Sequence, residues 1–328
     1  MESTDMPSGQ AADSLLSQGA GDIAVHTFRV WSRGITTYAA VAAMFLVTYE
    51  ILKISSMWFL FGELGLTLVP VGTTPLANMD SFRTFVMIVT YSISAMSYGL
   101  SLTALAVTLM LVGLPIGAFA IGAMIHITGD ISNTTQRRSF WAGVMRARLR
   151  LVELTGVFIV TGIIAGVFFV PLAVLSQAAT GAGVSADAAL YVLLVPSVTL
   201  AVIGLYVLAR LLPAMAVATR ENLGVLASVR KAWDLTRRNV IHVLGSAALV
   251  NLVLGLVAFA EIVLVAVLQL VGLVVSTITI TIVITIVNLL FFSSVHFVYQ
   301  SLLYDDLTAR ERLLRKDASE AASDGALW

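Results

Sequence analysis

Long apolar stretches, interrupted by short polar ones, make up most of this 328-residue chain. Three of these stretches carry no charged residue: 84–129, 154–186 and 262–304. A helix needs about 20 apolar residues to cross a bilayer core, so each stretch is long enough for one span or two. The pattern predicts an all-α polytopic transmembrane bundle with about six spans, at roughly 36–58, 85–111, 155–175, 189–213, 241–268 and 273–298.

The second of these helices is the least regular, because residues 82–129 are apolar for longer than one perpendicular helix requires. Two complete helices here would place the arginines of 137–150 on the opposite side of the membrane from the other basic clusters. We therefore expect one long helix. Since proline removes a backbone donor and kinks helices, we expect a break near Pro115, after which residues 116–128 slope into the cytoplasmic interface. A span followed by a re-entrant segment is the alternative.

The positions of lysine and arginine predict the orientation. Most of the 19 basic residues fall into four short segments, 29–33, 137–150, 220–238 and 310–316. Cytoplasmic connections retain positive charge, and the connections between these clusters lack it, so an even number of crossings separates successive clusters. We expect three hairpins, with both termini on the cytoplasmic side of the cell membrane.

Composition agrees with a membrane protein. Hydrophobic residues make up 59% of the chain and charged residues 12%, about half of the charged share usual in soluble domains. The absence of cysteine excludes disulfides, thiolate metal sites and a cysteine nucleophile. We expect membrane lipids as partners, with other membrane subunits or a second copy as open alternatives, and no nucleic acid.

The predicted domain organisation follows from the hairpins. We expect a membrane domain over 22–315, built from hairpin units at about 22–129, 130–218 and 219–308. Residues 1–21 and 316–328 are rich in small and polar residues, and we expect both to be disordered cytoplasmic tails.

A basic amphipathic stretch precedes each predicted hairpin. In the first and third stretches, aligning Arg33 with Arg238 places Phe28 over Trp233, while Gly34 and Asn239 stand where each helix should end. Helices with aromatic residues on one side and arginine on the other lie in the headgroup plane. We therefore predict interfacial helices, with specific binding of an anionic lipid or a partner as the alternative. The predicted anchors are Trp31, Trp141, Trp233, Arg33 and Arg238.

Two segments resemble motifs of a known group of membrane proteins. Residues 219–237 are similar to Glu-x-x-Gly-x-x-x-Ala-x-x-x-Ser-x-x-Leu-Thr, matched by Glu221, Gly224, Leu235 and Thr236. Residues 303–311 are similar to Leu-Tyr-Tyr-Asp-Leu-Arg-x-Arg, although Asp305 replaces the second tyrosine and Thr308 the first arginine.

The group that these motifs resemble comprises the membrane domain of glycerophosphodiester phosphodiesterases and related prokaryotic six-span membrane proteins. The resemblance covers about residues 22–315. It implies a six-span fold and a membrane location, and it implies no particular reaction. In that group, hydrolysis takes place on an appended soluble barrel of about 250 residues, and no hydrophilic segment between the predicted spans approaches that length.

The search for catalytic chemistry finds little. The four histidines are scattered, without the i, i+4 pair of a zinc site. The sequence contains no phosphate-binding loop and no Gly-x-Ser-x-Gly elbow, and the predicted spans contain no aspartate. We expect no catalytic residues, no metal and no cofactor, and hence no enzyme.

Ionisable residues at membrane depth are costly and are functional candidates by default. Glu50 and Lys53 lie three residues apart in the first span, so they share a helix face. We expect Lys53 to pair with Glu50 or with Glu261 of the fifth span, either as a structural ion pair or as a site for a coupling ion or substrate. We treat Arg210, near the cytoplasmic end of the fourth span, as interfacial.

Two asparagines lie well inside predicted spans. We expect Asn251 and Asn288 to form interhelical hydrogen bonds, worth roughly 0.6–2 kcal/mol each. Together with Glu50, Lys53 and Glu261 they make up the candidate intramembrane polar site.

The sequence leaves two hypotheses for the function. The repeated hairpins and the scarcity of charge at membrane depth favour a non-enzymatic membrane scaffold or the accessory subunit of a membrane assembly. The alternative is a transporter or permease for a lipid-like or small amphipathic solute, favoured by Glu50, Lys53, Glu261 and the internal repeat.

Overall fold

A computed structural model describes residues 19–52, 55, 100–133, 140–181, 186–270 and 283–325 of the chain. These residues form helices joined by short turns and contain no strand. Six of the helices are long and apolar enough to cross a membrane. The prediction of an all-α polytopic bundle is therefore confirmed.

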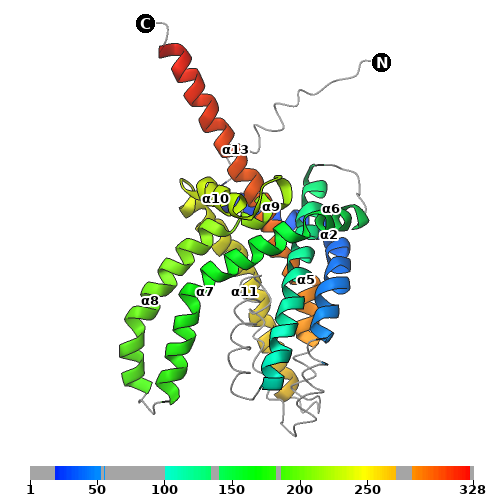
Figure 1. The fold of residues 1–328 in the computed structure, drawn as a ribbon, viewed down its shortest axis with the longest axis vertical. Helices are drawn as coiled ribbons and strands as arrows, with labels where there is room; N and C mark the ends of the chain where they lie inside the picture. The colour runs from blue at the N-terminus through cyan, green and yellow to red at the C-terminus, as the bar shows by residue number, and fades with distance from the viewer. Residues whose placement is uncertain are drawn as a thin grey trace.

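The long helices run between two ends of the molecule, and the short helices gather at one of them (Figure 1). The first long helix consists of α2 (Ala20–Val41), a π-helical segment η1 (Ala42–Val47) and one further turn to Leu52. The others are α5 (Leu100–Asn133), α7 (Leu151–Gly181), α8 (Ala186–Leu211), α11 (Val240–Leu270), and the π-helical segment η3 (Asn288–Phe292) with α13 (Ser293–Gly325). The short helices are α6 (Phe140–Leu149), α9 (Ala214–Arg220) and α10 (Val225–Thr236).

The basic segments lie at the end where the short helices gather. Residues 140–150 belong to α6 and the turn after it, and residues 220–238 belong to α9, α10 and the turns beside them. Figure 1 shows α6, α9 and α10 together at this end, with the C-terminal part of α13 projecting past them, while α7 ends and α8 begins at the opposite end. We call the end with the short helices the basic end.

The predicted break at Pro115 is wrong. α5 passes through Pro115 as one continuous helix, and Leu111–Ser132 within it is long and apolar enough to cross a membrane, where we had expected an interfacial segment. Met124 and Ile125 are fully buried, and α5 packs against α2, α7 and α13. Helices in membranes tolerate proline because neighbouring groups satisfy the freed carbonyl, so the apolar packing of α5 outweighs the lost backbone bond. The predicted span at 85–111 lies largely outside the described residues.

The expectation that Gly34 ends a helix is also wrong. α2 continues through Gly34 without a break, whereas the second and third amphipathic stretches are separate helices, ended by turns at Arg150 and at 237–239. Gly34 serves close packing instead. A Cβ at this position would lie 2.5 Å from Ile131 Cδ1 and 2.6 Å from Tyr38 Cε2.

Burial supports the alignment of the first and third stretches. Ile23, Thr27 and Val30 of α2 are buried, and so are the aligned residues Ser228, Ala232 and Leu235 of α10. The two helices therefore bury the same face. Because α10 ends and α2 does not, the repeat preserves the packing face rather than the helix boundary.

Two further segments differ from the expectation. α13 remains helical to Gly325, although residues 316–325 were expected to be disordered; alanine, glutamate and lysine favour helix in this stretch. The short helix α9 was not anticipated, because its apolar sequence reads as the end of the fourth span. Of the predicted N-terminal tail, residues 1–18 lie outside the described part of the chain.

The arrangement of the two ends gives a topology test. A cysteine introduced by Ala227→Cys, at an exposed position of α10, should be labelled only from the cytoplasm, and Gly181→Cys only from outside. Ser228 is unsuitable as a probe because it is fully buried. The natural chain has no cysteine, so a membrane-impermeant maleimide reports each position without background. Labelling of both positions from the same side would contradict the single crossing, by α8, that we expect between them.

Candidate functional site

The predicted intramembrane polar residues come together only in part. The Asn288 side chain is 5% exposed, and its Nδ2 donates to Glu261 Oε2 at 3.0 Å. This bond joins α11 to the sixth span, so the expectation of an interhelical bond is confirmed for Asn288. Asn288 is also the first residue of η3, which packs against η1 of the first span. Two π-helical segments therefore meet beside a carboxylate.

Of the other three residues, Asn251 does not join this pair. Asn251 is exposed, and its Nδ2 donates to the Ala247 carbonyl of its own helix at 2.8 Å, so the expected interhelical bond is wrong for Asn251. Glu50 is partly exposed one turn beyond η1. Lys53 lies outside the described residues, so its pairing stays a prediction.

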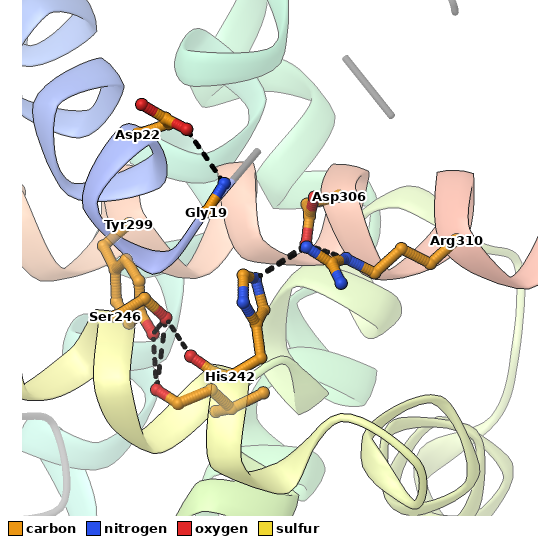
Figure 2. A network of polar contacts seen from close by, with 8 residues as sticks. Gly19, Asp22, His242, Ser246, Tyr299, Asp306 and Arg310 are labelled. Atoms are coloured by element: carbon orange, nitrogen blue, oxygen red, sulfur yellow. Dashed lines mark hydrogen bonds and ion pairs between the residues drawn. The ribbon is translucent and has the colours of Figure 1, made fainter. Parts of the chain in front are cut away.

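A second polar cluster lies at the basic end, between α11 and α13 (Figure 2). Asp306 Oδ2 accepts from Arg310 Nε at 2.9 Å and lies 3.1 Å from His242 Nε2. His242 Nε2 also lies 3.2 Å from Arg310 Nη2. A protonated Nε2 can donate to Asp306, and an unprotonated one can accept from Arg310, so either tautomer is satisfied. One turn deeper, Tyr299 Oη lies 2.8 Å from Ser246 Oγ and donates to the Val243 carbonyl.

A third cluster connects α9 and α10 with α13. Arg220 Nη1 lies 2.7 Å from Asp305 Oδ1. Glu221 accepts from Tyr304 Oη at 2.7 Å and forms an ion pair with Lys231 at 2.7 Å. The two motifs that carry the family resemblance thus meet in space, since Glu221 belongs to one motif and Tyr304 to the other.

Arginines also hold the ends of the short helices. Arg150 Nη1 donates to the carbonyls of Ala218, Thr219 and Glu221. These carbonyls belong to the last turn of α9 and to its C-cap residue Glu221, where a helix end lacks intrahelical partners for them. Arg146 of α6 pairs with Asp130 of α5 at 3.1 Å. The arginines of these clusters therefore act as internal ties between helices.

Arg210, which we had treated as interfacial, is 4% exposed, and its depth in a membrane stays a prediction. Its guanidinium carbon lies 4.2 Å from the centroid of the Trp233 ring, Nη2 donates to the Trp233 carbonyl at 2.7 Å, and Nη1 donates to Tyr206 Oη at 2.8 Å. Aromatic faces and oxygen acceptors stabilise a buried guanidinium, although Arg210 Nε itself has no hydrogen-bond partner within the described residues. Arg210 therefore joins α8 to α10.

The predicted anchors differ in their surroundings. Trp31 is partly buried against the core, and its indole N–H donates to Ser294 Oγ and to the Phe291 carbonyl, at 3.0 Å each. Trp141 is 59% exposed and Trp233 is 36% exposed. Arg33 and Arg238 are also exposed. The depth of these residues in a membrane stays a prediction.

The side chains of these clusters connect helices through hydrogen bonds and ion pairs. Ser246 Oγ donates to the His242 backbone carbonyl and does not bond the imidazole, so the pair lacks the geometry of an activated serine. Within the described residues, no group of three or more His, Asp or Glu side chains is arranged to hold a metal ion. Sequence reasoning missed these clusters, although the i, i+4 spacing of Asp306 and Arg310 is a local sign of one of them.

The fold and these clusters define a multi-pass α-helical membrane protein. No family model, curated protein or solved structure matches the chain.

Proposed function

We propose that the protein is a non-enzymatic membrane scaffold that associates with other transmembrane helices through the outward face of α11. The observation that carries this proposal is the exposure of α11. Only 17% of its most apolar 18-residue window is buried, against 28% to 61% in the other five candidate spans. Lipid can cover an apolar helix face, so exposure alone does not require a protein partner.

Asn251 makes this face different from a purely lipid-facing one. It lies eleven residues into α11, which is about 16 Å from the start of the helix and near the middle of a ~30 Å hydrocarbon core. Its side chain uses one N–H on Ala247 and is otherwise exposed. An unsatisfied amide in hydrocarbon is costly, so a polar partner from another helix would stabilise this position.

The residues around Asn251 allow close approach. Ala248, Leu252, Gly255 and Phe259 are spaced four, three and four apart, so they share one helix face. A Cβ at Gly255 would meet nothing within 4 Å, so no internal contact accounts for this glycine. Small residues at such positions let a second helix approach the backbone.

A second copy of α11 is the occupant we propose. In a two-fold symmetric contact each residue near the axis faces its own copy. Asparagine carries both donors and an acceptor, so two Asn251 side chains can bond each other reciprocally. Copies of this chain can therefore assemble through identical α11 faces, without a second surface complementary to this one.

Cysteine cross-linking tests this proposal. Leu252→Cys should give a cross-linked dimer in native membranes, whereas Val202→Cys, on the exposed face of α8, should not. Adding Asn251→Leu should lower the dimerisation constant roughly 3- to 30-fold, because an interhelical polar bond is worth about 0.6–2 kcal/mol. Equal cross-linking at both cysteine positions, or none at Leu252→Cys, would overturn the homotypic interface.

A transporter is the second candidate, and one observation favours it. Glu261 and Asn288 form a polar pair beside η3, which packs against η1. π-helical turns occur frequently at functional sites. This pair has its hydrogen bond satisfied within the protein, which is why we place the scaffold first.

A further inference from the structure

The outward face of α10 combines exposed cations with exposed apolar side chains. Leu226, Arg230, Trp233 and Arg237 are spaced four, three and four apart, so they form one stripe along the helix, and all four are exposed. Ser228, Ala232 and Leu235 are buried on the opposite face. The stripe is therefore the surface that α10 presents outward from the bundle.

The guanidinium groups on this surface are not neutralised by the protein. No carboxylate in the described part of the chain forms an ion pair with Arg230, Arg237 or Arg238, and the exposed Asp234 is not among their partners. Lys231, on the side of α10 that faces α13, does pair with Glu221. The stripe and the adjacent Arg238 thus keep three positive charges for an external anion.

Trp233 is held in place between these charges. Arg210 lies beneath its ring at 4.2 Å, and the Tyr206 ring meets it edge-on at 6.4 Å between centroids. Because α8 fixes the indole from below, the outer part of the ring forms a rigid apolar surface. Preorganisation of this kind lowers the entropic cost of binding.

The apolar surroundings indicate a lipid rather than a soluble anion. Ile241, at the start of α11, is 87% exposed and Leu226 is 74% exposed. Below the stripe, α8 exposes Val202 (62%) and Leu205 (56%), the surface expected to meet acyl chains. Arginine binds phosphate oxygens in bidentate geometry, and a nucleic acid or an acidic protein would leave the adjacent apolar surface uncovered.

We propose that the α10 stripe binds the phosphoryl headgroup of an anionic glycerophospholipid, with the acyl chains along α8. Arg230, Arg237 and Arg238 supply the charge, and Leu226, Trp233 and Ile241 contact the glycerol and upper acyl region. The first amphipathic stretch lacks two of these three arginines, because Val25 and Ser32 align with Arg230 and Arg237. The site is therefore absent from the first repeat, and it does not depend on association through α11.

Titration of phosphatidylglycerol into the full-length protein in phosphatidylcholine-containing micelles tests this site. We expect phosphatidylglycerol to raise the thermal unfolding midpoint of the natural protein. The triple variant Arg230→Gln/Arg237→Gln/Arg238→Gln should need at least about tenfold more of it, because each arginine contributes roughly fivefold and neighbouring charges do not add fully.

A matched control removes the same charge elsewhere. Arg312→Gln/Arg315→Gln/Lys316→Gln changes three exposed residues in the C-terminal part of α13 and should leave the titration within about twofold of the natural protein. Equal shifts in both triple variants would overturn the site. Equal stabilisation by inorganic phosphate would identify a free anion as ligand and overturn the lipid assignment.

A second readout does not depend on stability. Phosphatidylglycerol brominated on its acyl chains should quench the fluorescence of Trp233 more than brominated phosphatidylcholine does, with Trp233→Phe isolating the contribution of this residue. The α10 triple variant should abolish the difference between the two lipids. Equal quenching by both lipids in the natural protein would contradict selective binding of the anionic one.

Discussion

Asp306→Ala is expected to lower the free energy of unfolding by about 3 kcal/mol. The Asp306 side chain is 5% exposed and is the carboxylate partner of both Arg310 and His242. Removing it leaves a guanidinium that is only 26% exposed without its ion pair. The partial exposure of Arg310 places the expected loss at the lower end of the range for a broken buried pair.

A neighbouring residue of α13 supplies the matched control. Glu311 pairs with Arg315 at the same i, i+4 spacing, but the Arg315 side chain is 78% exposed. Exposed pairs contribute about 0–1 kcal/mol, so Glu311→Ala should change stability by at most about 0.5 kcal/mol. Denaturant unfolding in detergent micelles, followed by tryptophan fluorescence, measures both variants. Similar losses for the two variants would contradict a special role for the buried cluster.

Replacing the whole pair gives a further expectation. Asp306→Leu/Arg310→Met removes both charges together, so no buried ion is left unpaired. This double variant should be more stable than Asp306→Ala alone. If it is less stable, then His242 rather than Arg310 is the partner that makes Asp306 necessary.

The spans were the most predictable part of the fold, because a helix in a bilayer must be apolar along its whole length. The fifth candidate span, Val240–Val267, coincides closely with its expected position at 241–268, whereas the third and the sixth overlap theirs only in part. Pro115 misled the prediction of the second, because a local rule about backbone donors cannot include the packing of Met124 and Ile125 against other helices. α9 was missed because nothing in its apolar sequence separates it from the preceding span.

The candidate site was predictable only residue by residue. The cost of burying Glu261 and Asn288 identified both as groups that need a partner, and each proved to be the partner of the other. The same reasoning could not identify Arg210 with Trp233, or Glu221 with Tyr304, because these pairs join segments that no local pattern connects. Burial cost indicates that a polar group must be satisfied, while the topology decides by which group.

Gly34→Ala is expected to lower the free energy of unfolding by about 1–3 kcal/mol, the usual cost of overpacking. The added Cβ would lie 2.5 Å from Ile131 Cδ1 and 2.6 Å from Tyr38 Cε2. The Tyr38 ring cannot move aside easily, because it is fully buried and its hydroxyl lies 2.9 Å from Thr128 Oγ1. α2 and α5 would therefore have to separate.

Gly117→Ala separates this steric effect from the general effect of glycine on a helix. Gly117 lies inside α5, where a Cβ would meet nothing within 4 Å, so alanine should be neutral or stabilising by up to about 1 kcal/mol. Gly34→Ala/Ile131→Ala should be more stable than the sum of the two single losses predicts, because trimming Ile131 makes room for the new methyl group. Thermal unfolding of the four variants and the natural protein measures these differences. Exact additivity of Gly34→Ala and Ile131→Ala would show that the Gly34 effect does not arise from contact with Ile131.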